Sequence, residues 1–226
     1  MRPLRRLILT ALLGLAAGAS TFALASPAAP QEGAEYVTLQ SPQPLEAGNK
    51  VEVIEFFAYY CPHCYAFEPQ LEAWVKKQGG NIVFKRVHVS GGAGVLPQQR
   101  LFYTLDAMGL LPQYHQQVFD AMHVLHQRLG TDEEAFDWAA RNGIDRARFI
   151  DTYRSFGIQA RLRRASSMMD AYQVPFWPLI VIDGRWQTSP SQAGSKLPEG
   201  STEAQQQQAS LQVMDALVAK AKASRK

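Results

Sequence analysis

The sequence contains very little cysteine: Cys61 and Cys64 are the only two in 226 residues. A structural zinc site is disfavoured, because such sites use four ligands and no second cysteine pair exists. A disulfide between these two positions would close a loop too short to restrain the unfolded chain much, so a purely structural crosslink is also a poor interpretation. A thiol pair that opens and closes reversibly fits the pattern better.

Long apolar runs are lacking after the first 25 residues, and no later segment is apolar enough to cross a bilayer. Residues 1–25 combine a basic start, an apolar stretch from Leu7 to Ala19 and the cleavage motif Ala23-Leu24-Ala25, which together predict a secretory signal peptide. A retained membrane anchor is the alternative, but this stretch is short for a span of about 20 residues. We therefore expect a soluble mature chain that begins near Ser26.

Net charge is low once the leader is set aside, and the sequence has no repeats. Three of the 23 Lys and Arg residues lie in residues 1–25, which leaves 20 basic against 20 acidic side chains. This balance of basic and acidic side chains does not indicate nucleic-acid binding, and no nucleic-acid partner is expected. A secreted chain with a single cysteine pair is typical of a redox protein in a compartment that permits disulfides.

The cysteine pair lies at a predicted junction between a strand and a helix. Val51–Phe57 is an apolar, β-branched and aromatic run, as expected of a buried strand. Residues Tyr65–Lys77 form an amphipathic helical pattern, and Pro62 suits the first position of that helix. Free backbone N–H groups and the helix dipole favour a negative charge there, so Cys61 should ionise below the usual thiol value of about 8.5.

This placement assigns different roles to the two sulfurs. Cys61, at the mouth of the helix, is expected to be the sulfur that attacks and is attacked, and the more buried Cys64 is expected to resolve the mixed disulfide. A stabilised Cys61 thiolate makes the oxidised pair a stronger oxidant. His63 adds a hydrogen-bond donor or a partial positive charge beside it. A c-type haem site is disfavoured, because Tyr65 and not histidine follows Cys64.

The segment Phe56–Tyr65, FFAYYCPHCY, resembles the active-site segment of the DsbA family of periplasmic thiol:disulfide oxidases. The Pro62-His63 dipeptide carries most of this resemblance. It implies a periplasmic dithiol oxidase that donates its Cys61–Cys64 disulfide to newly exported, unfolded polypeptides with free cysteines, through a mixed disulfide at Cys61. It further implies reoxidation by a DsbB-like, quinone-linked membrane partner. No bound cofactor or metal is expected, and the protein is expected to be a monomer.

The remaining elements are predicted from their sequence patterns. Strand character occurs at residues 36–39, 81–89 and 179–182, and the last of these leads into an Asp183-Gly184 hairpin turn. Only helical signals occur from Leu96 to Tyr172, including a capping box at Thr131–Glu134. Ser201 is expected to cap a terminal helix that ends near Ala223. The Gln205–Gln208 run on that helix is interpreted as a solvated face.

This order of elements predicts an α/β chain, similar to the DsbA family in having a thioredoxin-like fold with an inserted all-helical domain. The helical block is far longer than the connection in one βαβ unit of roughly 30 residues. After the signal peptide, residues 1–25, the predicted parts are a lead-in, the first part of the thioredoxin-like domain, the helical insertion and the second part of that domain. They cover residues 26–50, 51–90, 91–164 and 165–226.

The resemblance also implies a cis-proline beside the cysteine pair, at the start of the later strand. Pro175 and Pro178 are the candidates, and Pro178 is favoured because it immediately precedes the apolar strand. The preceding residue is Trp177, where the family usually carries Val or Thr. Its backbone is expected to pair with the substrate chain as an added strand. Its ring either enlarges an apolar contact surface or fills a gap in the core, and the sequence favours neither.

Acidic and histidine side chains near this site have more than one interpretation. Glu55, six positions before Cys61, either snorkels to the end of the sheet or is a buried acid with a raised pKa that relays the proton of Cys64; the family resemblance favours the second. Glu68 is expected to have Lys85 or Arg86 as a charged neighbour. The histidines after His63 are interpreted as surface or core residues without a metal, namely His88, His115, His123 and His126.

Two other functions remain open from the sequence. The nearest is a thiol reductase or isomerase on the same fold, although isomerases of this type usually carry an N-terminal dimerisation domain for which the lead-in before Val51 is too short. The other is a peptide-binding chaperone in which Cys61 and Cys64 are incidental. The reduction potential of the pair distinguishes an oxidase from a reductase.

Overall fold

The computed structural model describes residues 29–225, and the predicted signal peptide and its cleavage point lie outside them. The chain forms a five-stranded sheet in the order β1-β5-β4-β2-β3. Its strands are β1 (Val37–Thr38), β2 (Val51–Phe57), β3 (Ile82–His88), β4 (Leu179–Ile182) and β5 (Trp186–Thr188). Strands β2 and β3 pair in parallel, and the other neighbours are antiparallel. The strands predicted around 36–39, 51–57, 81–89 and 179–182 are therefore confirmed.

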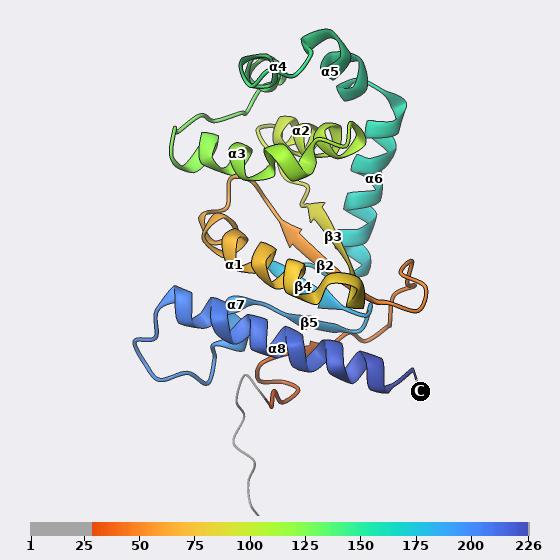
Figure 1. The fold of residues 1–226 in the computed structure, drawn as a ribbon, viewed down its shortest axis with the longest axis vertical. Helices are drawn as coiled ribbons and strands as arrows, with labels where there is room; N and C mark the ends of the chain where they lie inside the picture. The colour runs from red at the N-terminus through yellow and green to blue at the C-terminus, as the bar shows by residue number, and fades with distance from the viewer. Residues whose placement is uncertain (1–28, 226) are drawn as a thin grey trace, which may run out of the picture.

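Helices cover the sheet and extend beyond one end of it (Figure 1). Helices α1 and α8 cross one face of the sheet, while α2 to α5 lie past the ends toward which β2 and β3 point, and α6 connects that layer to the sheet region. The helices are α1 (Pro62–Gln78), α2 (Leu96–Ala107), α3 (Leu111–His123), α4 (Asp132–Arg141), α5 (Arg146–Tyr153), α6 (Phe156–Ala171), α7 (Pro190–Ala193) and α8 (Glu203–Ala223). A short 3-10 turn, Gly79–Asn81, follows α1.

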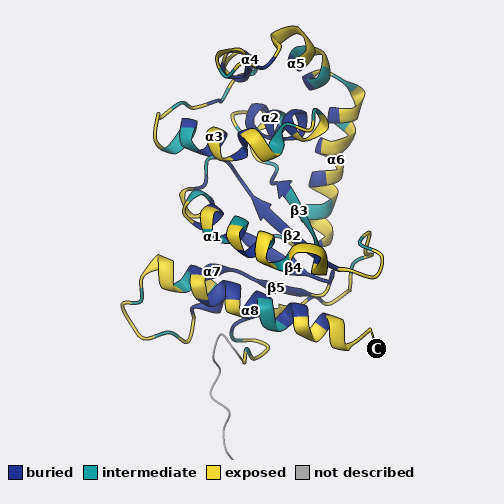
Figure 2. Cartoon of the chain, viewed as in Figure 1, coloured by how far each residue is buried: buried dark blue, intermediate teal, exposed yellow. Residues whose placement is uncertain are grey.

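Strand β2 divides the interior into two apolar cores, because successive side chains of a strand point to opposite faces. Val51 and Val53 pack with Trp74 of α1 and with the inner face of α8. Ile54 and Phe56 join the larger core, which continues into the helical layer. Figure 2 shows the consequence: strands β2, β4 and β5 are buried along their whole length, whereas α8 is buried only on its inner side.

The helical block is inserted between β3 and β4, as predicted. The capping box of α4 is present: the N–H of Glu134 donates to the Thr131 hydroxyl and the Glu134 carboxylate accepts from the N–H of Thr131. Helix α6 runs through residue 164, so the boundary predicted there falls inside a helix, and the division into parts stays a prediction.

Two predictions about the C-terminal region are wrong. The cap of α8 is Thr202 and not Ser201, whose hydroxyl donates instead to the Pro198 carbonyl. The glutamine run is not uniformly solvated, because Gln207 is buried and accepts a hydrogen bond of 2.7 Å from the side chain of Gln70 on α1. A glutamine with a partner on a facing helix is part of the packed interface.

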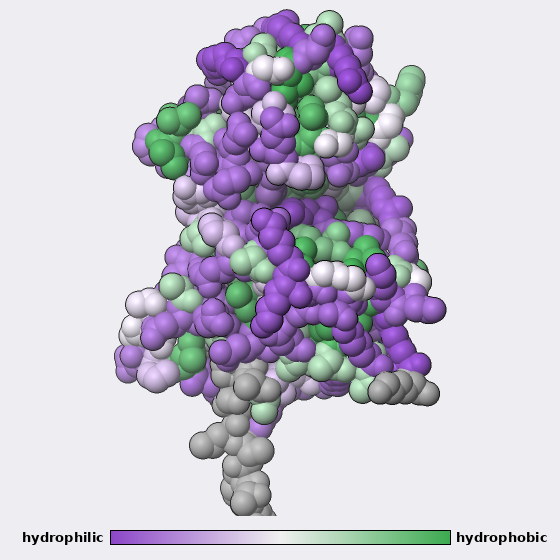
Figure 3. Space-filling view, viewed as in Figure 1, coloured by the Kyte–Doolittle hydropathy of each residue, from purple (hydrophilic) through white to green (hydrophobic). Residues whose placement is uncertain are grey.

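The face of the molecule seen in Figure 3 is mostly hydrophilic, with apolar side chains gathered at a few places. One lies at the end of α3, where the following residues Val124 and Leu125 are 56% and 64% exposed. Within residues 29–225, no helix has the length and apolarity needed to span a membrane.

Candidate active site

The sequence C61-P-H-C64 forms the start of α1, directly after β2 and a short turn. Cys61 is the N-cap of the helix, Pro62 follows at its first position, and the Sγ of Cys61 accepts from the backbone N–H of Cys64 at 3.3 Å. The Cys61 N–H donates to the Ala58 carbonyl at 3.1 Å, which fixes the turn out of the strand. Both residues are free thiols, and their relative exposures are 5% for Cys61 and 0% for Cys64.

The pKa values of the two thiols are shifted in opposite directions. The pKa of Cys61 is lowered to about 7, mainly by a hydrogen bond from the Cys64 side chain and further by the backbone N–H groups of Cys64 and His63 and by the charge of His63. The pKa of Cys64 is raised well above its usual value, first by burial and then by its hydrogen bond to Cys61. This asymmetry agrees with the predicted order of attack, in which Cys61 reacts first.

The peptide bond between Trp177 and Pro178 is cis, as predicted for Pro178. The Trp177 carbonyl lies 3.8 Å from the Sγ of Cys61, which donates to it. The Trp177 ring meets the ring of Tyr60 edge-on, with the centroids 6.2 Å apart. It is partly buried against the larger core and also lines a pocket of about 410 Å³ together with His63 and Pro178. Both interpretations of the ring therefore have a structural basis.

His63 contacts a residue that the sequence analysis missed. Its Nδ1 lies 2.8 Å from Oε1 of Glu203, the first residue of α8, and this hydrogen bond raises the pKa of His63. Both side chains are largely exposed, at 68% and 45%. Glu203 is 140 positions away in the sequence, and the one available signal was an acidic residue in the first turn of the last helix.

Glu55 is fully buried beneath α1, so the interpretation that it snorkels to solvent is wrong. Its Oε2 accepts from Nε of Arg86 at 3.1 Å, and the same guanidinium donates to Glu68 at 2.6 Å and to Glu72 at 3.2 Å. Burial and the neighbouring charge of Glu68 raise the pKa of Glu55 to about 8, although Arg86 opposes this. The cationic neighbour of Glu68 is thus Arg86, whereas Lys85 binds Glu46 and Glu52.

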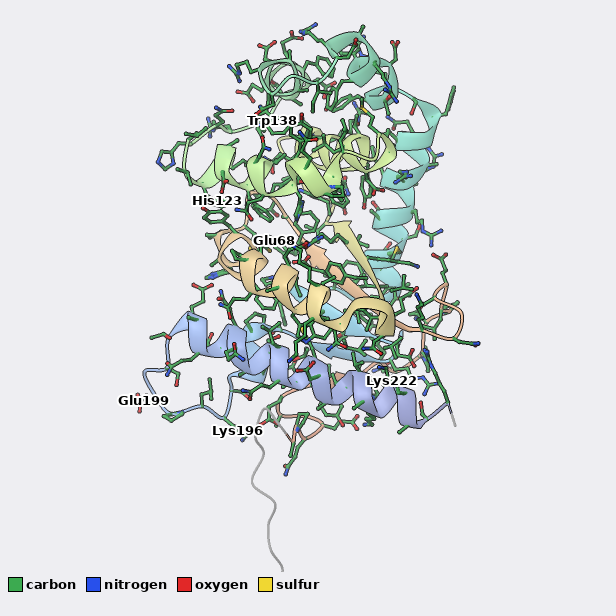
Figure 4. The ribbon with its side chains drawn as sticks, in the orientation of Figure 1. Glu68, His123, Trp138, Lys196, Glu199 and Lys222 are labelled. Atoms are coloured by element: carbon green, nitrogen blue, oxygen red, sulfur yellow. The ribbon has the colours of Figure 1, made fainter. Side chains whose placement is uncertain are left out.

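Three histidines hold Tyr59, two positions before Cys61. The Tyr59 N–H donates to Nε2 of His88 at 3.1 Å, its hydroxyl bonds Nδ1 of His115 at 2.9 Å, and its carbonyl lies 2.8 Å from Nε2 of His123. His123 lies at the end of α3 (Figure 4) and its ring also stacks on that of Tyr65. In the described part of the chain, no three His, Cys, Asp or Glu side chains are grouped so that they could hold a metal ion.

Comparison with known proteins gives one consistent result. Residues 52–200 match the family described as DSBA-like thioredoxin domain. The chain is 43% identical to the thiol:disulfide interchange protein DsbA of Burkholderia cepacia over 195 residues, which covers 85% of this chain and 91% of that protein. The corresponding protein of Pseudomonas aeruginosa PAO1 is 39% identical over 192 residues, covering 84% and 90%. The crystal structure of Pseudomonas aeruginosa DsbA superposes with a TM-score of 0.77 at 35% identity, covering 85% of this chain and 95% of that one.

Proposed function

The chain belongs to the family of DSBA-like thioredoxin domains and is a thiol:disulfide oxidoreductase of the DsbA type, and from this premise we propose that it is a dithiol oxidase of exported proteins. The proposed site comprises Cys61 and Cys64 with Pro62, His63 and Pro178, and with Glu55 beneath them. Trp177 and Pro178 contact the substrate. The observation that carries the proposal is the asymmetry of the pair: a thiol with a lowered pKa at the helix start, and a buried thiol with a raised pKa behind it.

The first step is attack of a substrate thiolate on Sγ of Cys61 in the oxidised protein. The Cys61–Cys64 bond breaks, a bond from Cys61 to the substrate forms, and Cys64 leaves with the electron pair. Cys64 then takes up a proton, because its thiolate is disfavoured by burial. Glu55 is the proposed donor, since it is a buried acid whose pKa lies near neutral pH.

The second step releases the product. A second thiolate of the substrate attacks the substrate sulfur that is bound to Cys61, so the substrate gains a disulfide and Cys61 leaves as a thiolate. A low pKa makes Cys61 a good leaving group and stabilises the reduced protein. The substrate has lost two electrons and two protons, and the Cys61–Cys64 pair has gained two electrons.

Substrate binding uses the loop before β4. The carbonyl of Trp177 lies 3.8 Å from Sγ of Cys61, and a backbone group beside the nucleophile suits pairing with an extended, unfolded chain. Backbone pairing depends little on the amino-acid sequence of the substrate. An oxidase that acts on many exported polypeptides needs this broad specificity. The predicted signal peptide places the protein in the periplasm, where a DsbB-like, quinone-linked membrane oxidase regenerates the disulfide and the protein acts as a monomer.

The direction of the reaction is tested by equilibrating the purified mature protein with glutathione and measuring the reduction potential of the Cys61–Cys64 pair. We expect a value near that of a DsbA-type oxidant, about −120 mV. A value near that of thioredoxin, about −270 mV, would overturn the oxidase assignment and make the protein a reductase. Formation of disulfides in a reduced, unfolded protein, monitored by thiol labelling, provides the second measurement.

A further inference from the structure

The side chains of His63 and Glu203 form an ion pair at the mouth of the redox site, between the first turn of α1 and the first turn of α8. Nδ1 of His63 lies 2.8 Å from Oε1 of Glu203. From this geometry, and resting on the thiol chemistry proposed for Cys61, we propose that Glu203 is a positioning residue: it orients the His63 ring and keeps it protonated, and through His63 it sets how far the Cys61 thiolate is stabilised above neutral pH.

The carboxylate of Glu203 is held in place from two directions. It belongs to the first turn of α8, whose N-terminus is fixed by a capping box between Thr202 and Gln205. Its Oε1 also accepts from Nε2 of Gln207 at 3.4 Å, and Gln207 in turn accepts from Gln70 on α1 at 2.7 Å. Glu203 is therefore tied to the same helix that carries His63, which limits the entropy lost when the ion pair forms.

Few other charges face this pair. The pocket that His63 and Glu203 line is completed by aromatic, proline, serine and glutamine side chains, none of which titrates near neutral pH. At the start of the same helix, the negative charge of the Cys61 thiolate also favours the protonated His63 ring. The imidazolium thus interacts favourably with two anions, the Glu203 carboxylate and the Cys61 thiolate.

The Glu203 carboxylate therefore affects how stabilisation of the Cys61 thiolate by His63 depends on pH. The hydrogen bond to Glu203 raises the pKa of His63. Without it, the ring returns toward the ordinary histidine value of about 6.5 and becomes neutral at slightly alkaline pH. Stabilisation of the Cys61 thiolate by His63 is then lost above that pH and retained below it. Because both side chains are well exposed, solvent screening keeps the effect modest.

The test compares Glu203→Gln with Glu199→Gln in the full mature protein. Glu199 is an exposed residue at the outer edge of the loop before α8, so its replacement makes the same change in net charge away from His63 (Figure 4). The His63 pKa is measured by NMR, the Cys61 pKa by thiolate absorbance, and the exchange equilibrium with glutathione as a function of pH.

For Glu203→Gln we expect a lower His63 pKa, a higher Cys61 pKa, and an exchange equilibrium about two- to fivefold less oxidising above neutral pH, with the gap closing below about pH 6. Glu199→Gln should match the parent. In a His63→Ala background, Glu203→Gln should have no further effect. An unchanged His63 pKa would overturn the proposal, and so would an effect that persists without His63, since Glu203 would then act directly on the sulfur. These outcomes do not depend on whether the absolute potential is that of an oxidase.

Discussion

The hydroxyl of Tyr59 and Nδ1 of His115 form a buried hydrogen bond of 2.9 Å between residues that are 56 positions apart. Tyr59 belongs to the turn that leads into Cys61, and His115 belongs to α3 of the helical block. Burial lowers the pKa of His115 well below its usual value, so the ring is neutral and fits an apolar core of phenylalanine rings. The inserted helices therefore also hold in place the turn that precedes Cys61.

Replacing Tyr59 with phenylalanine is expected to lower the free energy of unfolding by about 1–3 kcal/mol, because Nδ1 of His115 is left buried without a partner. Urea unfolding checks this value. Tyr65→Phe is the matched control, since Tyr65 is only partly buried and a surface hydroxyl is worth within about 0.5 kcal/mol. If the two variants were equally stable, the Tyr59–His115 bond would not support the turn.

Elements whose signals are local in the sequence could be predicted well. The Val51–Phe57 strand, the helix start at Pro62 and the capping box at Thr131 each depend on neighbouring residues, and all are present in the structure. A local pattern determines these elements, because strand and cap residues act over a few positions. The cis bond was implied by the family resemblance, and the adjoining strand and turn favoured Pro178 over Pro175 as its place.

Features that depend on tertiary packing could not be predicted. Nothing in the chain near His63 indicates that α8 places Glu203 beside it. Nothing near Tyr59 indicates three histidine partners, two from α3 and one from the end of β3. Gln207 was assigned to a solvated face because glutamine usually is exposed, yet a partner on α1 makes its burial favourable. Such pairs are set by how helices cross, which single-sequence patterns do not encode.

Cys64→Ser is expected to accumulate a mixed disulfide between Cys61 and substrate, because no second thiol resolves the intermediate. The backbone N–H groups at positions 63 and 64 still lower the pKa of Cys61, and the serine hydroxyl can donate in place of the Cys64 thiol. Mass spectrometry of the reaction with an oxidised peptide disulfide detects the adduct. The reciprocal variant, Cys61→Ser, should give none, since the remaining thiol is fully buried and its pKa is raised. Equal adduct formation by both variants would contradict the assigned roles.

Glu55→Gln is expected to change the pH dependence of stability in a defined direction. The pKa of Glu55 is raised in the folded protein from 4.5 to about 8, so its contribution to stability is fully present below about pH 4.5 and is lost as the pH rises toward 8. The glutamine variant has no such loss. Its stability relative to the parent should therefore increase between about pH 5 and about pH 8, as measured by urea unfolding at each pH.

The control for Glu55 is Glu52→Gln on the same strand, because Glu52 is equally buried but paired with Lys85 on the side away from the cysteines. Its replacement removes a buried carboxyl from the same strand and leaves Glu55 in place. The same two variants test the proton relay. If Glu55 supplies the proton to Cys64, the rate of thiol exchange in Glu55→Gln becomes less dependent on pH, whereas an unchanged profile would contradict the relay.

Trp177→Val separates the two interpretations of the ring before the cis-proline. If the ring contacts substrate, the variant should oxidise an unfolded protein about two- to tenfold more slowly, because one aromatic contact worth about 0.5–1.5 kcal/mol is lost. Its reaction with glutathione should stay the same. If the ring instead fills the core beside Tyr60, the free energy of unfolding should fall and both reactions should change together. Phe176→Val is the matched control, because Phe176 lines the same pocket and is 43% exposed. A loss confined to Trp177→Val and to the protein substrate would place recognition at the residue whose carbonyl faces Cys61.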